Sequence, residues 1–123
     1  MARVFLDANY LIDLLENRQK FRVDDLGDHD ILISTLSVHI YTYISKLKIP
    51  DKQLSEAVDK FTIVEFTRNV CYKALEGPTS DFEDNVQLHS AASAEADLFL
   101  TNDKRLLGLK FFGKTKILRE LIN

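Results

Sequence analysis

This sequence has a single cysteine and no net positive charge. A single cysteine, Cys71, among 123 residues excludes an internal disulfide framework and a cysteine-rich zinc site. We therefore expect a reducing, intracellular compartment, the cytoplasm. The net charge of −3 argues against a protein that coats nucleic acid by bulk charge alone. An enzyme with a local basic rim remains compatible with that charge.

Long apolar runs are missing as well. No segment approaches the roughly eighteen consecutive apolar residues that a membrane span needs, so we expect no membrane association. Asp7 interrupts the first apolar stretch, which argues against a signal peptide. The composition, 46% hydrophobic and 28% charged, is typical of a globular protein. The length fits one domain over residues 1–123.

Short apolar runs alternate with helical patterns along the chain. The predicted strands cover residues 2–6, 31–33, 61–66, 97–100 and 110–112, and the predicted helices cover residues 8–16, 36–47, 51–59, 68–76, 80–96 and 114–122. Ser80 and Glu83 form an S-x-x-E capping box at the start of the fifth helix. The polar stretch 24–30 predicts a short helix or turn. This alternation predicts a three-layer α/β/α fold with a central, mostly parallel sheet of four to five strands.

Three acids follow these elements at positions that suit an active site. Asp7 follows the first strand, Asp103 follows the fourth, and Asp84 lies early in the helix that leads into the fourth. If the first and fourth strands are parallel neighbours, Asp7 and Asp103 emerge at the same sheet edge. Clustered carboxylates repel one another without a cation, and their hard oxygens suit Mg²⁺ or Mn²⁺. The three acids therefore predict a metal site for phosphodiester hydrolysis.

Each of these acids also has a structural interpretation. Asp7 and Asp103 could be helix N-caps, since Asp is a favoured residue there. Asp81 and Glu83 are explained by the helix dipole and the capping box, which gives them mainly structural roles. Asp84 lies beyond the cap and is harder to explain in this way. The three acids together favour a functional site.

Other polar residues adjoin the predicted site. Thr101 and Ser34 end predicted strands at the same face, where a hydroxyl could orient a carboxylate or cap a helix. We favour a site role for Thr101 and leave Ser34 open. Asn9 could reach substrate or metal, or serve in a turn. Lys104 and Arg105 could contact phosphates or form a solvated charged face.

Taken together, these motifs resemble the PIN-domain family, including VapC-type toxins of toxin–antitoxin pairs. The resemblance is carried by VFLDAN at residues 4–9, LIDLL at 11–15, ISTLS at 33–37, SDFED at 80–84 and ADLFLTND at 96–103. It implies a PIN-like fold and Mg²⁺- or Mn²⁺-dependent RNA cleavage. Asp7, Asp84 and Asp103 would be the catalytic and metal-binding acids, with the Thr101 hydroxyl beside the last. The resemblance also implies a homodimer and a cognate antitoxin.

One position departs from the family pattern. The family usually places a glutamate in the helix after the Ser-Thr segment, and by register Ile40 occupies that place, beside His39. His39 could replace the lost ligand or be a surface or packing residue, and Asp81 could supply charge. Two hypotheses follow: a metal-dependent ribonuclease, or a degenerate PIN domain that binds nucleic acid or protein without catalysis. A phospho-acceptor receiver domain ranks below both, because the segment 61–66 ends without an acceptor aspartate.

Overall fold

A single sheet organises the chain. The computed structural model describes residues 1–16 and 26–121. The sheet has six strands in the order β3-β2-β1-β4-β6-β5. Their bounds are β1 (Arg3–Leu6), β2 (Asp30–Ser34), β3 (Thr62–Val64), β4 (Leu98–Leu100), β5 (Phe111–Phe112) and β6 (Thr115–Leu118). All pairings are parallel except the antiparallel pairing of β5 with β6, so the mostly parallel sheet is confirmed.

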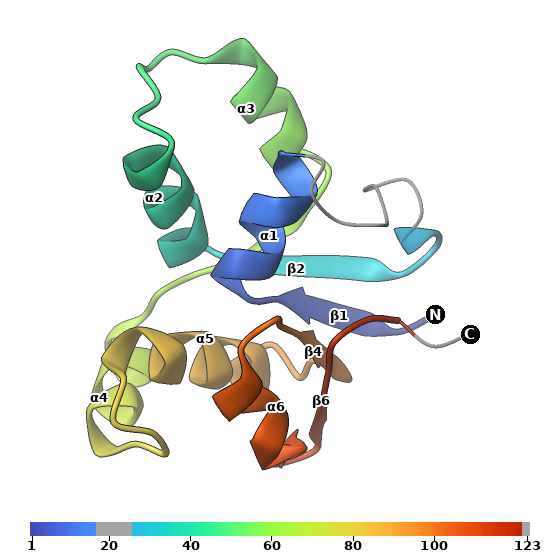
Figure 1. Cartoon of the computed structure of the whole chain (residues 1–123), viewed down its shortest axis with the longest axis vertical. Helices are drawn as coiled ribbons and strands as arrows, with labels where there is room; N and C mark the ends of the chain where they lie inside the picture. The colour runs from blue at the N-terminus through green and yellow to red at the C-terminus, as the bar shows by residue number, and fades with distance from the viewer. Residues whose placement is uncertain (17–25, 122–123) are drawn as a thin grey trace.

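Helices cover both faces of this sheet. Figure 1 shows α1, α2 and α3 on one side of the strands and α4, α5 and α6 on the other. Their bounds are α1 (Ala8–Leu15), α2 (Thr35–Ile44), α3 (Lys52–Val58), α4 (Arg68–Glu76), α5 (Phe82–Ser93) and α6 (Lys104–Leu109). The predicted three-layer α/β/α fold is therefore confirmed. No helix of the described residues is long and apolar enough to cross a membrane.

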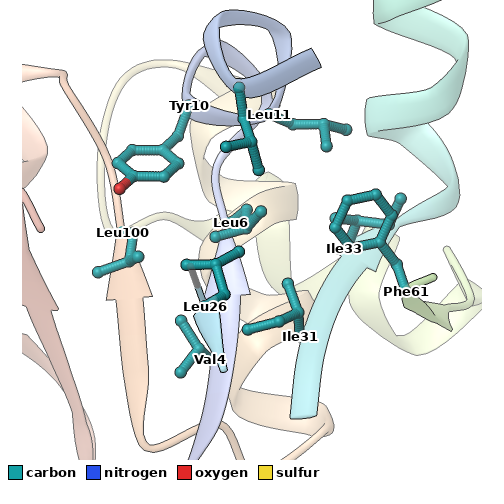
Figure 2. Close-up of a cluster of buried hydrophobic side chains, with 10 residues drawn as sticks. Val4, Leu6, Tyr10, Leu11, Leu26, Ile31, Ile33, Phe61 and Leu100 are labelled. Atoms are coloured by element: carbon teal, nitrogen blue, oxygen red, sulfur yellow. The ribbon is translucent and has the colours of Figure 1, made fainter. Parts of the chain in front are cut away.

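The strands separate two apolar cores. Val4 and Leu6 of β1 face α1 and pack with Tyr10 and Leu11, as Figure 2 shows. Phe5, between them, faces the opposite core with residues of α5 and α6. Successive side chains of a strand point to opposite faces, so a strand covered on both sides is apolar throughout. This explains why the first strand has no polar alternation before Asp7.

The C-terminal segment differs from its prediction. The sequence pattern predicts a helix over residues 114–122, but Thr115–Leu118 form β6, which pairs with β4 and β5. Residue 122 lies outside the described residues. Thr115 and Ile117 are buried while Lys116 is exposed, which is the period-two burial of a strand. The positive φ of 60° at Gly113 makes the turn between β5 and β6. The sheet thereby gains a strand beyond the expected four to five.

The start of α5 also differs from its prediction. The helix begins at Phe82, and its N-cap is Asp81, whose Oδ1 accepts the Asp84 N–H at 3.0 Å. The Ser80–Glu83 capping box was therefore wrong, because a carboxylate one residue later takes the capping position. The expected helix or turn over 24–30 lies partly outside the described residues. Its described part is a turn around Gly27 that leads into β2.

Candidate metal-binding active site

The sheet brings two of the predicted acids to one edge. Leu6 of β1 is in register with Leu100 of β4, and the two strands are parallel neighbours, as expected. The Asp7 N–H donates to the Leu100 carbonyl at 2.9 Å, so the chain leaves β1 directly beside β4. Asp7 and Thr101 thus follow adjacent strands at their carboxyl ends. This is where open parallel sheets bind ligands.

Asp7 is both a helix cap and a buried acid. Its side chain is 4% exposed. Its Oδ1 accepts the Ala8 N–H at 2.9 Å and caps α1, while its Oδ2 accepts the Thr101 hydroxyl at 2.7 Å. Burial raises the pKa of Asp7 to about 7, the two hydrogen bonds oppose that rise, and the charges of Asp84 and Asp103 add to it. The capping role therefore does not exclude a site role.

Thr101 connects the first acid to the last. The buried hydroxyl donates to Asp7 and accepts the Asp103 N–H at 3.0 Å. Asp103 in turn caps α6, because its Oδ1 accepts the N–H groups of Arg105 at 2.8 Å and Leu106 at 3.3 Å. One hydroxyl thus fixes the end of β4 and the start of α6 relative to Asp7.

Asp84 approaches the same place from α5. Its side chain is 17% exposed. Burial raises the pKa of Asp84 to about 6, helped by the charges of Asp81 and Asp103 and opposed by the charge of Arg105. The Arg105 Nη2 lies 3.9 Å from the Asp84 Oδ2 and 3.7 Å from the Asp103 Oδ2. Asp84 and Asp103 therefore share one cationic partner.

The donor chemistry fits a small divalent ion. In the part of the chain that the structure describes, no three Asp, Glu, His or Cys side chains meet closely enough to hold an ion by themselves. Mg²⁺ needs no such cage, because it usually keeps several waters and binds one or two carboxylates. Asp84 and Asp103 already converge on one cation, and the mutual repulsion of the acids favours another positive charge. The residues thus fit Mg²⁺ or Mn²⁺.

Ser34 belongs to a different cluster. It caps α2, and its hydroxyl donates to the Gln87 Oε1 at 2.7 Å, while the Gln87 Nε2 donates to the Ser37 hydroxyl at 2.7 Å. All three side chains are fully buried. The sequence reasoning missed Gln87, whose signal was its place one turn after Asp84 in a helix of small residues. This cluster ties α2 to α5 beneath Asp84.

The remaining predicted positions lie nearer the surface. Asn9 is exposed in the first turn of α1. His39 is exposed and stacks on Tyr43, with ring centroids 6.3 Å apart. Ile40 lines a groove of about 300 Å³ between α2 and Glu83 of α5. Asn102, which was not predicted, donates to the Asp13 Oδ2 at 3.0 Å and links β4 to α1.

Comparison with known proteins agrees with this architecture. A family model described as a PIN domain matches residues 3–105. The chain belongs to the PIN-domain family. Among solved structures it is similar to VapBC2 from Rickettsia felis bound to a DNA fragment from their promoter, with a TM-score of 0.67 and 13% identity. That match covers 94% of this chain and 97% of the other, and at this identity it shows a shared fold. A comparison with curated proteins gave no match.

The structure thus brings most of the predicted site together. Asp7, Thr101 and Asp103 are joined by hydrogen bonds, and the charges of Asp84 and Asp103 both act on Asp7. Asp81 adds its charge to Asp84 and holds the backbone of that residue. The catalytic and metal-binding roles of these side chains remain predictions.

Proposed function

We propose that this PIN domain is a divalent-metal-dependent endoribonuclease of the VapC type that hydrolyses RNA phosphodiester bonds. Asp7, Asp84 and Asp103 would be its catalytic, metal-binding acids, and Mg²⁺ or Mn²⁺ its ion. The observation that carries the proposal is the linkage of buried Asp7 through Thr101 to Asp103, with the charge of Asp84 acting on Asp7, at the carboxyl edge of the sheet. Membership of the PIN-domain family supports a nuclease.

Each acidic side chain would have a role that follows from its contacts. Asp7 has both carboxylate oxygens held by hydrogen bonds, so its charge is fixed in place before substrate arrives. Asp84 and Asp103 would hold the ion together with Asp7, and the ion would supply the positive charge that stabilises a phosphodiester during displacement. Asp81 would add negative charge and hold the start of α5. Such preorganised charges require no rearrangement when the transition state forms.

Two further residues would have supporting roles. Asn9 is exposed in the first turn of α1, two residues after Asp7, from which it would reach the RNA. Ser34 would act through Gln87, by keeping α5 and therefore Asp84 in place against α2. We place both outside the acidic centre itself.

Partners would bind an exposed apolar region at the end of α2. The similar solved structure is VapBC2 bound to a DNA fragment from their promoter. This assembly supports a cognate antitoxin for this chain. Three apolar side chains are strongly exposed on or after α2: Tyr43 at 77%, Ile44 at 57% and Ile49 at 70%. Exposed apolar groups in one region mark protein contacts. We propose an antitoxin or a second copy of the chain as the partner and the cytoplasm as the location.

The test of the enzyme is RNA cleavage. We expect single-stranded RNA to be cut with Mg²⁺ or Mn²⁺ and to survive with EDTA. Asp7→Asn, prepared in the same way, should lose at least about a hundredfold of the activity, because it removes the central charge. Asp59→Asn, an exposed carboxylate after α3, is the matched control and should keep it. Metal-dependent cleavage that survives Asp7→Asn would show that the site has been misassigned.

A degenerate binding module is the second candidate. The observation that favours it is Ile40 in the place where the family carries a glutamate, on a helix whose only buried residue is Ser37. Calorimetric titration with Mn²⁺ separates the two functions. Binding in the micromolar range that is lost in Asp84→Asn would exclude the degenerate module.

A further inference from the structure

Arg105 extends from the rim of the acidic centre across two of its acids. Its Nη2 is within 4.0 Å of one carboxylate oxygen of Asp84 and one of Asp103, although the side chain is 74% exposed. Its backbone is fixed at the same time, because its N–H donates to the other oxygen of Asp103 at 2.8 Å. The residue is therefore anchored at the start of α6 while its guanidinium group is exposed to solvent.

The two acids have few other sources of positive charge. Asp84 is flanked by Asp81 and Glu83, and Asp103 is joined through Thr101 to Asp7. Among the described residues, the ion pairs of Asp84 and Asp103 are formed with Arg105 alone. A guanidinium group thus supplies the compensating charge at the place where we propose a divalent ion.

We propose that Arg105 is a resident counter-ion that a divalent cation must displace from Asp84 and Asp103 in order to bind. This inference rests on the proposed metal site. Both cations would use the same carboxylate oxygens, and two positive charges about 4 Å apart repel each other. Ion pairs of an exposed side chain are weak, so the guanidinium can leave while its backbone anchor remains. Arg105 would thereby lower the affinity of the free site for metal.

Direct metal binding tests this role without any RNA. Mn²⁺ is titrated calorimetrically into the metal-free wild type and into Arg105→Gln at low ionic strength. The loss of two exposed ion pairs should lower the Kd for Mn²⁺ by about fivefold. Lys104→Gln is the matched control. It removes the same charge from the adjacent exposed residue of α6 and leaves the ion pairs of Asp84 and Asp103 intact. Arg105→Lys, which keeps the charge, should stay near the wild type.

The possible results separate this inference from the proposed enzyme. If the wild type binds Mn²⁺ and Arg105→Gln binds it equally or more weakly, the counter-ion role is wrong. The proposed metal site is then still supported. Equal tightening in Lys104→Gln also overturns it, because general charge would then explain the effect. If no variant binds Mn²⁺, both the counter-ion role and the metal site fail. Circular dichroism of each variant confirms that it is folded before titration.

Discussion

Asp7→Asn should make the metal-free protein more stable at pH 8 while leaving its fold unchanged. Asparagine is as good an N-cap as aspartate, so its side-chain oxygen can still accept the Ala8 N–H. Its amide can donate to the Thr101 hydroxyl oxygen, in place of the bond that Thr101 now donates. The substitution therefore removes little except the buried charge.

The size of the effect follows from the pKa of Asp7. Burial raises that pKa from 3.8 to about 7. The folded chain then binds more protons than the unfolded chain between these values, so the free energy of unfolding falls as pH rises through this range. At 1.36 kcal/mol for each pKa unit, the ionised Asp7 lowers the stability above pH 7 by about 4 kcal/mol. The redirected Thr101 hydroxyl offsets part of the gain, so we expect Asp7→Asn to gain about 2 kcal/mol at pH 8.

Urea unfolding with EDTA, followed by circular dichroism, measures this difference. At pH 4 both chains carry a neutral side chain at position 7 in the folded state, so most of the gain should disappear. Asp59→Asn, an exposed residue, should change little at either pH. A destabilising effect of Asp7→Asn at pH 8, or an equal effect at pH 4 and pH 8, would refute a destabilising buried charge at position 7.

Two other substitutions test the surroundings of the acids. Ser34→Ala should lower the free energy of unfolding by about 2 kcal/mol in urea, because it leaves the buried Gln87 oxygen without its donor. Its affinity for Mn²⁺ should fall as well, because Asp84 loses the support that Ser34 gives through Gln87, and an unchanged affinity would show that Ser34 does not help to position Asp84. Ile40→Glu, which restores an acid at the family position, should tighten Mn²⁺ binding in calorimetry. An unchanged affinity would show that position 40 does not face the ion.

The meeting of Asp7 with Asp103 could be predicted because it depends on a topological rule. Two strands that are parallel neighbours deliver the residues after them to the same edge, and the sequence marked both strand ends. The position of Asp84 in α5 could be predicted as well, because it lies one turn after Asp81, the N-cap of that helix. The correct N-cap of α5 could not be predicted, because Ser80 and Asp81 are both good N-caps and the backbone conformation decides between them.

The last strand could not be predicted from local pattern. Residues 115–118 alternate in burial, but such a short run is compatible with either a helix or a strand. The free edge of β4, whose residues precede their β6 partners by 18 positions in the chain, supplies the hydrogen bonds that make it a strand. The contacts of Gln87 could not be predicted for a similar reason, because its partners Ser34 and Ser37 lie about 50 residues earlier in the chain.

The dual use of Asp7 has an evolutionary consequence. A single-base change converts an aspartate codon to an asparagine codon, and at this position the product would keep the helix cap. Selection for folding alone would therefore favour asparagine, because the buried charge opposes folding at neutral pH. The proposed anionic site would supply a selection that opposes this change.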